Sequence, residues 1–176
     1  MPFTPFHFGP GLFISLIFLS FIDIPAFLIA SVIIDVEPFL VLFFDLNYPL
    51  HGFFHSFFGG LIVAVLLAMV MIKIRKYFTP MLTFFKIEQS ISLKKILFSS
   101  ICAIFIHILL DSPIYLDIQP FFPFEFNPFY SNTLWPGLFA YLICAWCFVG
   151  AILVYILRLL QYKFKNKSLD ELNRTC

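Results

Sequence analysis

The sequence predicts an all-α fold, a polytopic membrane helical bundle made of an N-terminal helical hairpin and three further transmembrane helices. Of the 176 residues, 61% are hydrophobic and only 12% are charged, which is about half of the charged fraction of a typical soluble domain. All 11 Lys and Arg residues fall in two windows, 73–95 and 158–174, and long apolar stretches separate these windows. These observations exclude a soluble globular protein.

The first 45 residues contain two short apolar segments, 11–22 and 24–34, which Asp23 and Pro25 separate. Each segment is too short to cross a hydrocarbon core of about 30 Å. We therefore predict that residues 1–45 form a hairpin of two antiparallel helices, which enters the bilayer and returns to the same side. One interrupted span over residues 11–34 is the alternative, and segment length does not separate the two.

Three longer apolar segments follow, at residues 52–72, 91–111 and 134–160. At a rise of about 1.5 Å per residue, each is long enough to cross the membrane as a helix. The basic loop 73–95 and the basic tail 161–176 lie on one side of these spans, and the positive-inside rule places that side in the cytoplasm. The sequence thus predicts an integral protein of the cell membrane.

The connection 112–133 lies on the predicted outer side and is rich in Pro and Phe. Its prolines exclude a continuous helix, and its aromatic side chains favour the headgroup region of the bilayer. We interpret the loop as an interfacial anchor, with a lid over an amphiphilic substrate as the alternative.

Ionisable residues gather on that outer side, although each costs at least about 2.5 kcal/mol at membrane depth. His51 and His55 are four residues apart, as are His107 and Asp111, and helical residues at this spacing project from one face. The other members of the group are His7, Asp35 and Glu37. A single membrane histidine is more often a packing residue, but seven candidate ligands from four segments favour a shared site.

Imidazole nitrogens and carboxylate oxygens are the usual ligands of zinc and related divalent ions. The sequence therefore predicts a divalent metal, zinc or alternatively manganese, at the outer face. The predicted metal ligands are His7, Asp35, His55, His107 and Asp111. Glu37 and His51 are the predicted catalytic residues, each as a general base or as a further ligand.

Four short motifs occur in a familiar order: the N-terminal stretch that ends in His7, then Asp35-Val-Glu37, Gly52-Phe-Phe-His55-Ser56, and His107-Ile-Leu-Leu-Asp111. Together they resemble the YdjM-like family of predicted membrane-bound metal-dependent hydrolases, which is thought to be distantly related to zinc-dependent phospholipase C and to single-strand nucleases. The resemblance covers roughly residues 1–130.

The resemblance matches His7 to the family's N-terminal histidine, Asp35 to the first acid of an Asp-x-Asp signature and His55 to the histidine before a serine. His107 and Asp111 match the His-x-x-x-Asp helix. The chain departs from the pattern where Glu37 replaces the usual second aspartate and where His51 aligns with an arginine. Ile34 and Pro38 also stand in place of a usual proline and a frequent histidine.

These observations predict a membrane-embedded metal-dependent hydrolase that attacks a phosphoester or an ester of a lipid or lipid-linked substrate through a metal-activated water. Two other functions remain open: a haem-binding electron carrier with His55 and His107 as axial ligands, and a non-catalytic scaffold or transporter subunit. The expected partner is the lipid bilayer. A net charge of +1 argues against nucleic acid.

Overall fold

The computed structural model describes the backbone of residues 4–175 and the side chains of residues 5–164. In this part of the chain all regular structure is helical, which confirms the predicted all-α fold. The elements, in chain order, are η1 (Thr4–His7), α1 (Phe8–Ile17), α2 (Ile24–Ile33), α3 (Val36–Phe43), η2 (Phe53–His55), α4 (Phe57–Ile74), η3 (Arg75–Phe78), α5 (Thr79–Phe84), α6 (Leu93–Asp111) and α7 (Trp135–Thr175).

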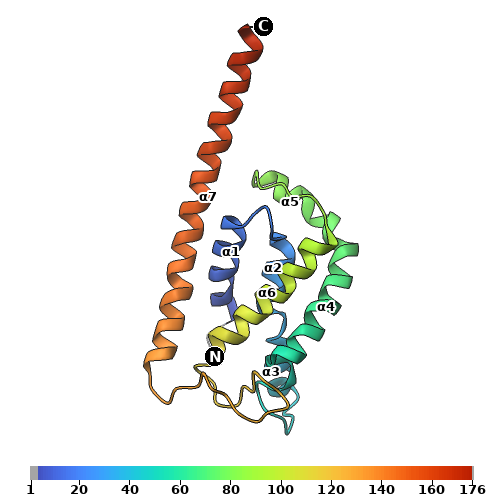
Figure 1. The fold of residues 1–176 in the computed structure, drawn as a ribbon, viewed down its shortest axis with the longest axis vertical. Helices are drawn as coiled ribbons and strands as arrows, with labels where there is room; N and C mark the ends of the chain where they lie inside the picture. Colours follow the sequence, from blue (N-terminus) through green and yellow to red (C-terminus); the bar gives the residue numbers. More distant parts are fainter. Residues whose placement is uncertain (1–3, 176) are drawn as a thin grey trace.

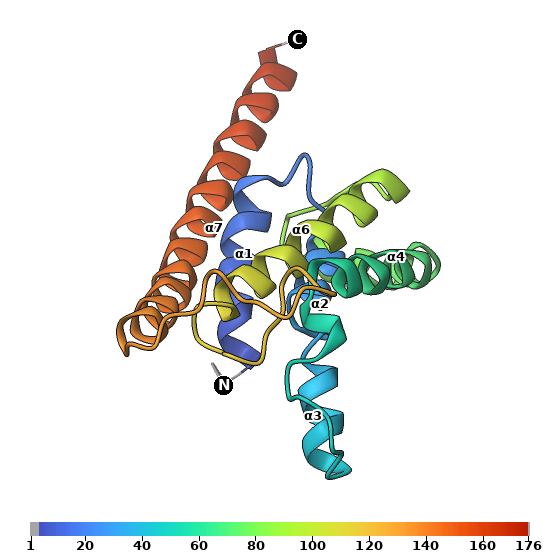
Figure 2. The ribbon, with the colours of Figure 1, turned by 60° about the horizontal axis from the view of Figure 1, so that its bottom comes forward.

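Four helical segments of the described chain are long and apolar enough to cross a membrane. They are Ile24–Phe43, Phe57–Phe84, Leu93–Asp111 and Trp135–Phe164. The last three correspond to the three predicted transmembrane helices. The first combines α2 with α3, a helix that the sequence analysis did not predict, and Figure 2 shows α3 projecting away from the rest of the bundle.

Helices α1 and α2 run antiparallel and side by side, each over ten residues (Figure 1). Helix α1 ends five residues before the predicted boundary, at Ile17, because the chain turns from Phe18 onwards. Asp23 then begins α2 as its N-cap, since its Oδ1 accepts a hydrogen bond of 3.1 Å from the Ala26 N–H. Pro25 occupies the first turn, where its missing N–H has no cost.

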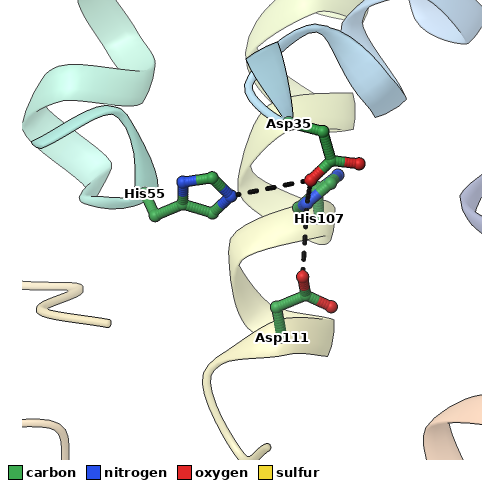
Figure 3. A group of neighbouring side chains, drawn as sticks. All are labelled: Asp35, His55, His107 and Asp111. Atoms are coloured by element: carbon green, nitrogen blue, oxygen red, sulfur yellow. Dashed lines mark ion pairs between the residues drawn. The ribbon is translucent and has the colours of Figure 1, made fainter. Parts of the chain in front are cut away.

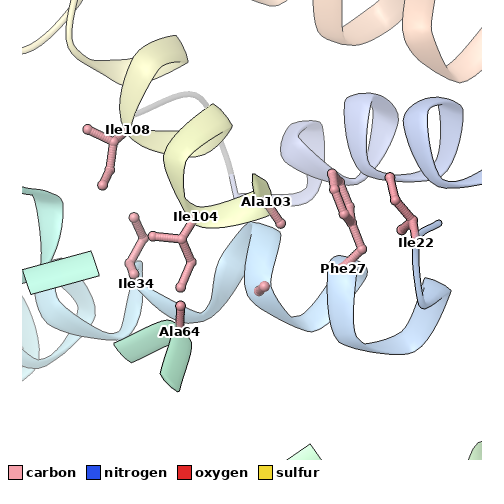
Figure 4. Close-up of a cluster of buried hydrophobic side chains, with 8 residues drawn as sticks. Ile22, Phe27, Ile34, Ala64, Ala103, Ile104 and Ile108 are labelled. Atoms are coloured by element: carbon pink, nitrogen blue, oxygen red, sulfur yellow. The ribbon is translucent and has the colours of Figure 1, made fainter. Parts of the chain in front are cut away.

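The core lies where α2, α4 and α6 meet (Figure 4). Phe27 of α2 and Ile34, directly after it, pack with Ala64 of α4 and with Ile104 of α6. Helices α4 and α6 approach closely at Gly60, because a Cβ atom there would lie 2.7 Å from Ile104 Cγ2. This packing fixes the position of α6, which carries His107 and Asp111, and of the C-terminal end of α2, which Asp35 follows.

Helix α7 packs along α1 and continues far beyond the bundle (Figure 1). Gly9 lets the two helices approach, since a Cβ atom at this position would collide with the Cys144 carbonyl. The predicted helix ends at residue 160 and a tail follows, whereas the helical backbone continues to Thr175.

The connection from 112 to 134 contains no helix, as its prolines predict. It folds back onto the start of α4, where the Phe57 N–H donates a 2.9 Å hydrogen bond to the Pro120 carbonyl. The Asn127 side chain also donates hydrogen bonds to the carbonyls of Ser112 and Tyr115. The loop therefore lies beside the C-terminal end of α6.

Candidate metal centre

Four of the five predicted metal ligands meet at this end of the bundle (Figure 3). Asp35 lies between α2 and α3, His55 ends η2, and His107 and Asp111 belong to α6. Each residue offers one ligand atom, and these four atoms all lie within 4.8 Å of one another. His107 and Asp111 face inwards because they continue the buried stripe of α6, one helical turn apart.

The spacing of the four residues matches that of ligands around one ion. Asp35 Oδ1 lies 3.3 Å from His107 Nε2 and 3.8 Å from His55 Nε2. Asp111 Oδ2 lies 3.4 Å from the same His107 nitrogen. Bonds of about 2.1 Å to a tetrahedral ion would separate neighbouring ligand atoms by about 3.4 Å.

Hydrogen bonds fix which nitrogen of each imidazole faces the cluster. His107 Nδ1 lies 2.7 Å from the Ser31 carbonyl oxygen, and His55 Nδ1 lies 2.9 Å from Glu37 Oε2. A carbonyl and a carboxylate only accept hydrogen bonds, so both Nδ1 atoms carry the proton and donate it. In the neutral imidazoles, both Nε2 atoms therefore present a lone pair towards the carboxylates, as metal-binding histidines do.

Several buried atoms of the cluster have no hydrogen-bond partner within the described part of the chain. They are Nε2 of His55 and of His107, Oδ2 of Asp35 and Oδ1 of Asp111. An unpaired buried polar group costs about 1–3 kcal/mol, and a charged one costs more. A cation would satisfy lone pairs and negative charge together, so the four residues could hold a metal ion.

Protons compete with such an ion at His55. Burial lowers the pKa of this imidazole, but the nearby Asp35 carboxylate and the hydrogen bond to Glu37 outweigh burial and raise the pKa above the ordinary value. The same two carboxylates that attract a metal cation thus also attract a proton.

His7, the fifth predicted ligand, lies at the edge of this group. Its ring stacks on that of His107, with centroids 3.9 Å apart and planes inclined by 12°. Its Nε2 lies 3.4 Å from Asp111 Oδ1. The Asp111 carboxylate therefore faces His107 with one oxygen and His7 with the other.

Glu37, a predicted catalytic residue, contacts His55 instead of the centre of the cluster. One carboxylate oxygen accepts the His55 hydrogen bond, and the other accepts a 3.1 Å hydrogen bond from the Phe54 N–H. These contacts hold the His55 ring in place. The general-base role of Glu37 stays a prediction.

His51, the other predicted catalytic residue, does not share a helix with His55. Helix α4 begins only at Phe57, because the Ser56 hydroxyl caps it by accepting a 3.0 Å hydrogen bond from the Gly59 N–H. The expected helical pair is therefore replaced by a turn, in which the rings of His51 and His55 meet edge to face at 4.8 Å.

Two residues of the 112–133 loop adjoin His51, and the sequence analysis did not assign them to the site. His51 Nδ1 lies 3.1 Å from Asp117 Oδ1, and its ring stacks on Tyr115 at 4.2 Å. Partial burial raises the pKa of Asp117, but hydrogen bonds from His51 outweigh it and leave that pKa below the ordinary value. Burial and the nearby charge of Asp111 raise the pKa of Tyr115.

No protein-family model, no curated protein and no solved structure matches this chain. The resemblance to the YdjM-like family therefore stays a prediction from its motifs.

Proposed function

We propose that this chain is a membrane-embedded metal-dependent hydrolase that cleaves a phosphoester or ester bond of a lipid or lipid-linked substrate. The observation that carries the proposal is the cluster of Asp35, His55, His107 and Asp111, whose ligand atoms lie within 4.8 Å of one another. The motif order that resembles the YdjM-like hydrolases supports the same reaction class.

Each residue of the site has a distinct task in this proposal. Asp35, His55, His107 and Asp111 bind a divalent ion, zinc or alternatively manganese. When bound, the ion acts as a Lewis acid and lowers the pKa of a coordinated water to about 7. Glu37 and the Ser31 carbonyl orient the two ligand imidazoles through their Nδ1 atoms.

His51 is the candidate general base of the proposed reaction. Its ring adjoins that of His55, and Asp117 accepts the hydrogen bond from its Nδ1. This contact leaves Nε2 of the neutral ring to accept a proton, and the Asp117 carboxylate would stabilise the imidazolium that results.

The surroundings of the cluster support a lipid or lipid-linked substrate. Two metal ligands lie at the end of a candidate membrane span, Leu93–Asp111. The adjoining loop presents exposed aromatic side chains, among them Phe122, Phe124 and Phe126. Aromatic residues prefer the membrane interface, so a scissile bond near the headgroups would reach the cluster.

The haem alternative is less well supported by the same contacts. Axial haem ligands from facing helices need the space between their nitrogens for iron and its macrocycle. Here the Asp35 carboxylate lies beside both Nε2 atoms, at 3.8 Å from His55 and 3.3 Å from His107. An absorbance scan of the purified protein tests this function, since a haem protein shows a Soret band.

The first experiment measures metal content in the full chain purified in detergent. After incubation with zinc or manganese and removal of free metal, mass spectrometry should find about one ion or more per wild-type chain. The H107A variant should bind no metal ion. The matched control is D45N, which removes an exposed carboxylate at a positive φ of 48° that Asn tolerates.

Hydrolysis of phosphoester and carboxylic ester lipids is then assayed with the same preparations. We expect turnover from the wild type and D45N, and none from H107A. Wild-type protein that binds no metal contradicts the proposal. The non-catalytic scaffold is favoured if two results are obtained together. The wild type binds metal but cleaves none of these lipids, and H107A performs the protein's cellular role as well as the wild type does.

A further inference from the structure

An apolar groove of about 600 Å³ runs along α6 on the face that α1 and α2 leave open. Its walls come from α1, from the turn that follows it, from α2 and from α6, and they include Ile14, Phe27 and Cys102. Phe18, Phe21 and Phe98 stand at its opening, with exposed fractions of 51%, 67% and 52%. Ligand cavities of this volume are common in proteins, and the apolar walls of this groove suit a hydrocarbon chain.

Positive charge lies at one end of the groove only. Lys94 and Lys95 line it there, and no acidic residue of the described chain lines it. Neither lysine forms an ion pair with any residue whose side chain the structure describes. The groove thus combines an apolar channel with an unbalanced cationic end.

The helix that carries these lysines adds to the attraction for an anion. Lys94 and Lys95 stand in the first turn of α6, where the helix macrodipole is positive and acidic residues are usual. Ser92 precedes that turn as the N-cap but makes no side-chain capping hydrogen bond. An anion at this end would offset both lysine charges and the positive helix terminus.

We infer that this groove binds an anionic glycerophospholipid of the membrane. The phosphate lies against Lys94 and Lys95, and an acyl chain follows α6 towards Ile106. The distance from Lys95 to Ile106 along the helix is about 16 Å, which accommodates an extended acyl chain. A zwitterionic lipid offers the same chain without net charge, so the lysines select for the anionic headgroup.

This lipid site is separate from the metal cluster, and the inference does not rest on the proposed hydrolase. Phe27 and Ile106 line both the groove and a small cavity beside His7 and His107. That cavity has a volume of only about 10 Å³, too small for an acyl chain to pass. The two lysines also lie in the first turn of α6, whereas His107 and Asp111 lie at its other end.

The test is a competition between two lipids for the full chain. Delipidated protein in detergent receives equal amounts of phosphatidylglycerol and phosphatidylcholine with identical acyl chains, and native mass spectrometry counts the bound lipids. We expect the wild type to retain phosphatidylglycerol roughly tenfold more than phosphatidylcholine, because each lysine near the headgroup contributes. K94Q/K95Q should lose this preference, and K94R/K95R should keep it.

The matched control is K73Q/K76Q, which removes two positive charges from the same 73–95 region but outside the groove. It should retain the wild-type preference. Equal loss of preference in this control would show that net charge alone selects the lipid and would overturn the site. Retention of the preference by K94Q/K95Q would overturn it as well.

Two further arms test the contribution of the apolar groove. Glycerol phosphate has the anionic group without acyl chains, so we expect it not to displace bound phosphatidylglycerol. Displacement of phosphatidylglycerol by an equal concentration of glycerol phosphate would mean that the apolar groove contributes nothing to lipid binding. C102W places a large ring inside the groove and should reduce binding of both lipids several-fold, and unchanged binding by the folded variant would contradict the acyl-chain position.

Discussion

At one end of the bundle Arg75 and Asp23 form a buried ion pair, whereas at the other end Asp35 and Asp111 form ion pairs only with histidines among the side chains that the structure describes. The Arg75 and Asp23 side chains are both 0% exposed, and Nε donates to Oδ2 at 2.5 Å. The Ala26 N–H satisfies the other Asp23 oxygen. Here a positive and a negative side chain balance each other inside the protein.

The cluster of Asp35, His55, His107 and Asp111 has no such balance. Its buried atoms without hydrogen bonds are carboxylate oxygens and imidazole Nε2 atoms, which accept protons or metal ions. At the Arg75 end the corresponding atoms are Nη1 and Nη2, which are donors of a cation that already faces a carboxylate. Buried charge alone therefore does not indicate a ligand site, whereas converging hydrogen-bond acceptors without a lysine or arginine beside them do.

The largest expected effect comes from disrupting the buried ion pair between Arg75 and Asp23. R75M leaves the Asp23 carboxylate buried without its cation, and should lower the free energy of unfolding by about 3–5 kcal/mol. Chemical denaturation of the protein in detergent measures this loss. D23N/R75M removes both charges while Asn still caps α2, so it should recover most of the stability; a double variant as unstable as R75M would contradict the ion-pair explanation.

The next largest effect is expected at the cluster of Asp35, His55, His107 and Asp111, where a bound metal ion should stabilise the folded state. Zinc at about 100 times its dissociation constant should stabilise the wild type by about 2.7 kcal/mol, because the ion binds only the folded state. H107A should show no such gain, whereas R75M should show it in full from its lower baseline. Thermal unfolding with and without zinc measures both, and an equal gain for H107A would separate zinc binding from this cluster.

A smaller effect is expected from the residue that orients His55. E37Q weakens the hydrogen bond to His55 Nδ1, and should reduce metal affinity by about 10–100-fold without changing the number of ions bound. Competition with a chelator of known affinity measures the change. The matched control is E88Q, because Glu88 is exposed in the loop between α5 and α6, and this variant should leave metal affinity unaltered. No change in E37Q would remove Glu37 from the site.

The smallest effect concerns Asp117, whose side chain is 36% exposed and therefore partly screened by water. Its pKa is depressed in the folded protein. The stability it contributes is thus present above the ordinary carboxyl pKa of about 3.9, and it is lost as the pH falls through the lower folded value. D117N should remove this part of the acid dependence in unfolding titrations while metal content stays unchanged; an identical acid limb in the variant would contradict it.

Much of the fold could be predicted because charge is so scarce in this chain. The clustering of Lys and Arg delimits the spans, and α6 begins within two residues of its predicted start. Helix α3 was missed because the sequence analysis ended the second apolar segment at residue 34; Pro38 lies in the first turn of this helix, where proline is tolerated.

Four of the five predicted metal ligands lie together in the structure, but their supporting contacts were not predicted. His107 and Asp111 show helical spacing, and their helix does form. His51 and His55 show the same spacing, but Gly52 precedes the short helix η2 and Ser56 caps α4 only after His55, so no α-helix contains both histidines. The Ser31 carbonyl has no signature in a sequence, because every residue has one, and only the packing of α2 on α6 brings it to His107.

The length of α6 has a consequence for the membrane that surrounds it. At a rise of about 1.5 Å per residue, the 19 residues of α6 form a helix about 28 Å long, which is close to the thickness of a hydrocarbon core. The helix has lysines in its first turn and Asp111 at its end, so it has little spare apolar length to tilt. Hydrophobic matching to α6 would therefore set the depth of His107 in a bilayer, and a thicker bilayer would move His107 and Asp111 further from bulk water.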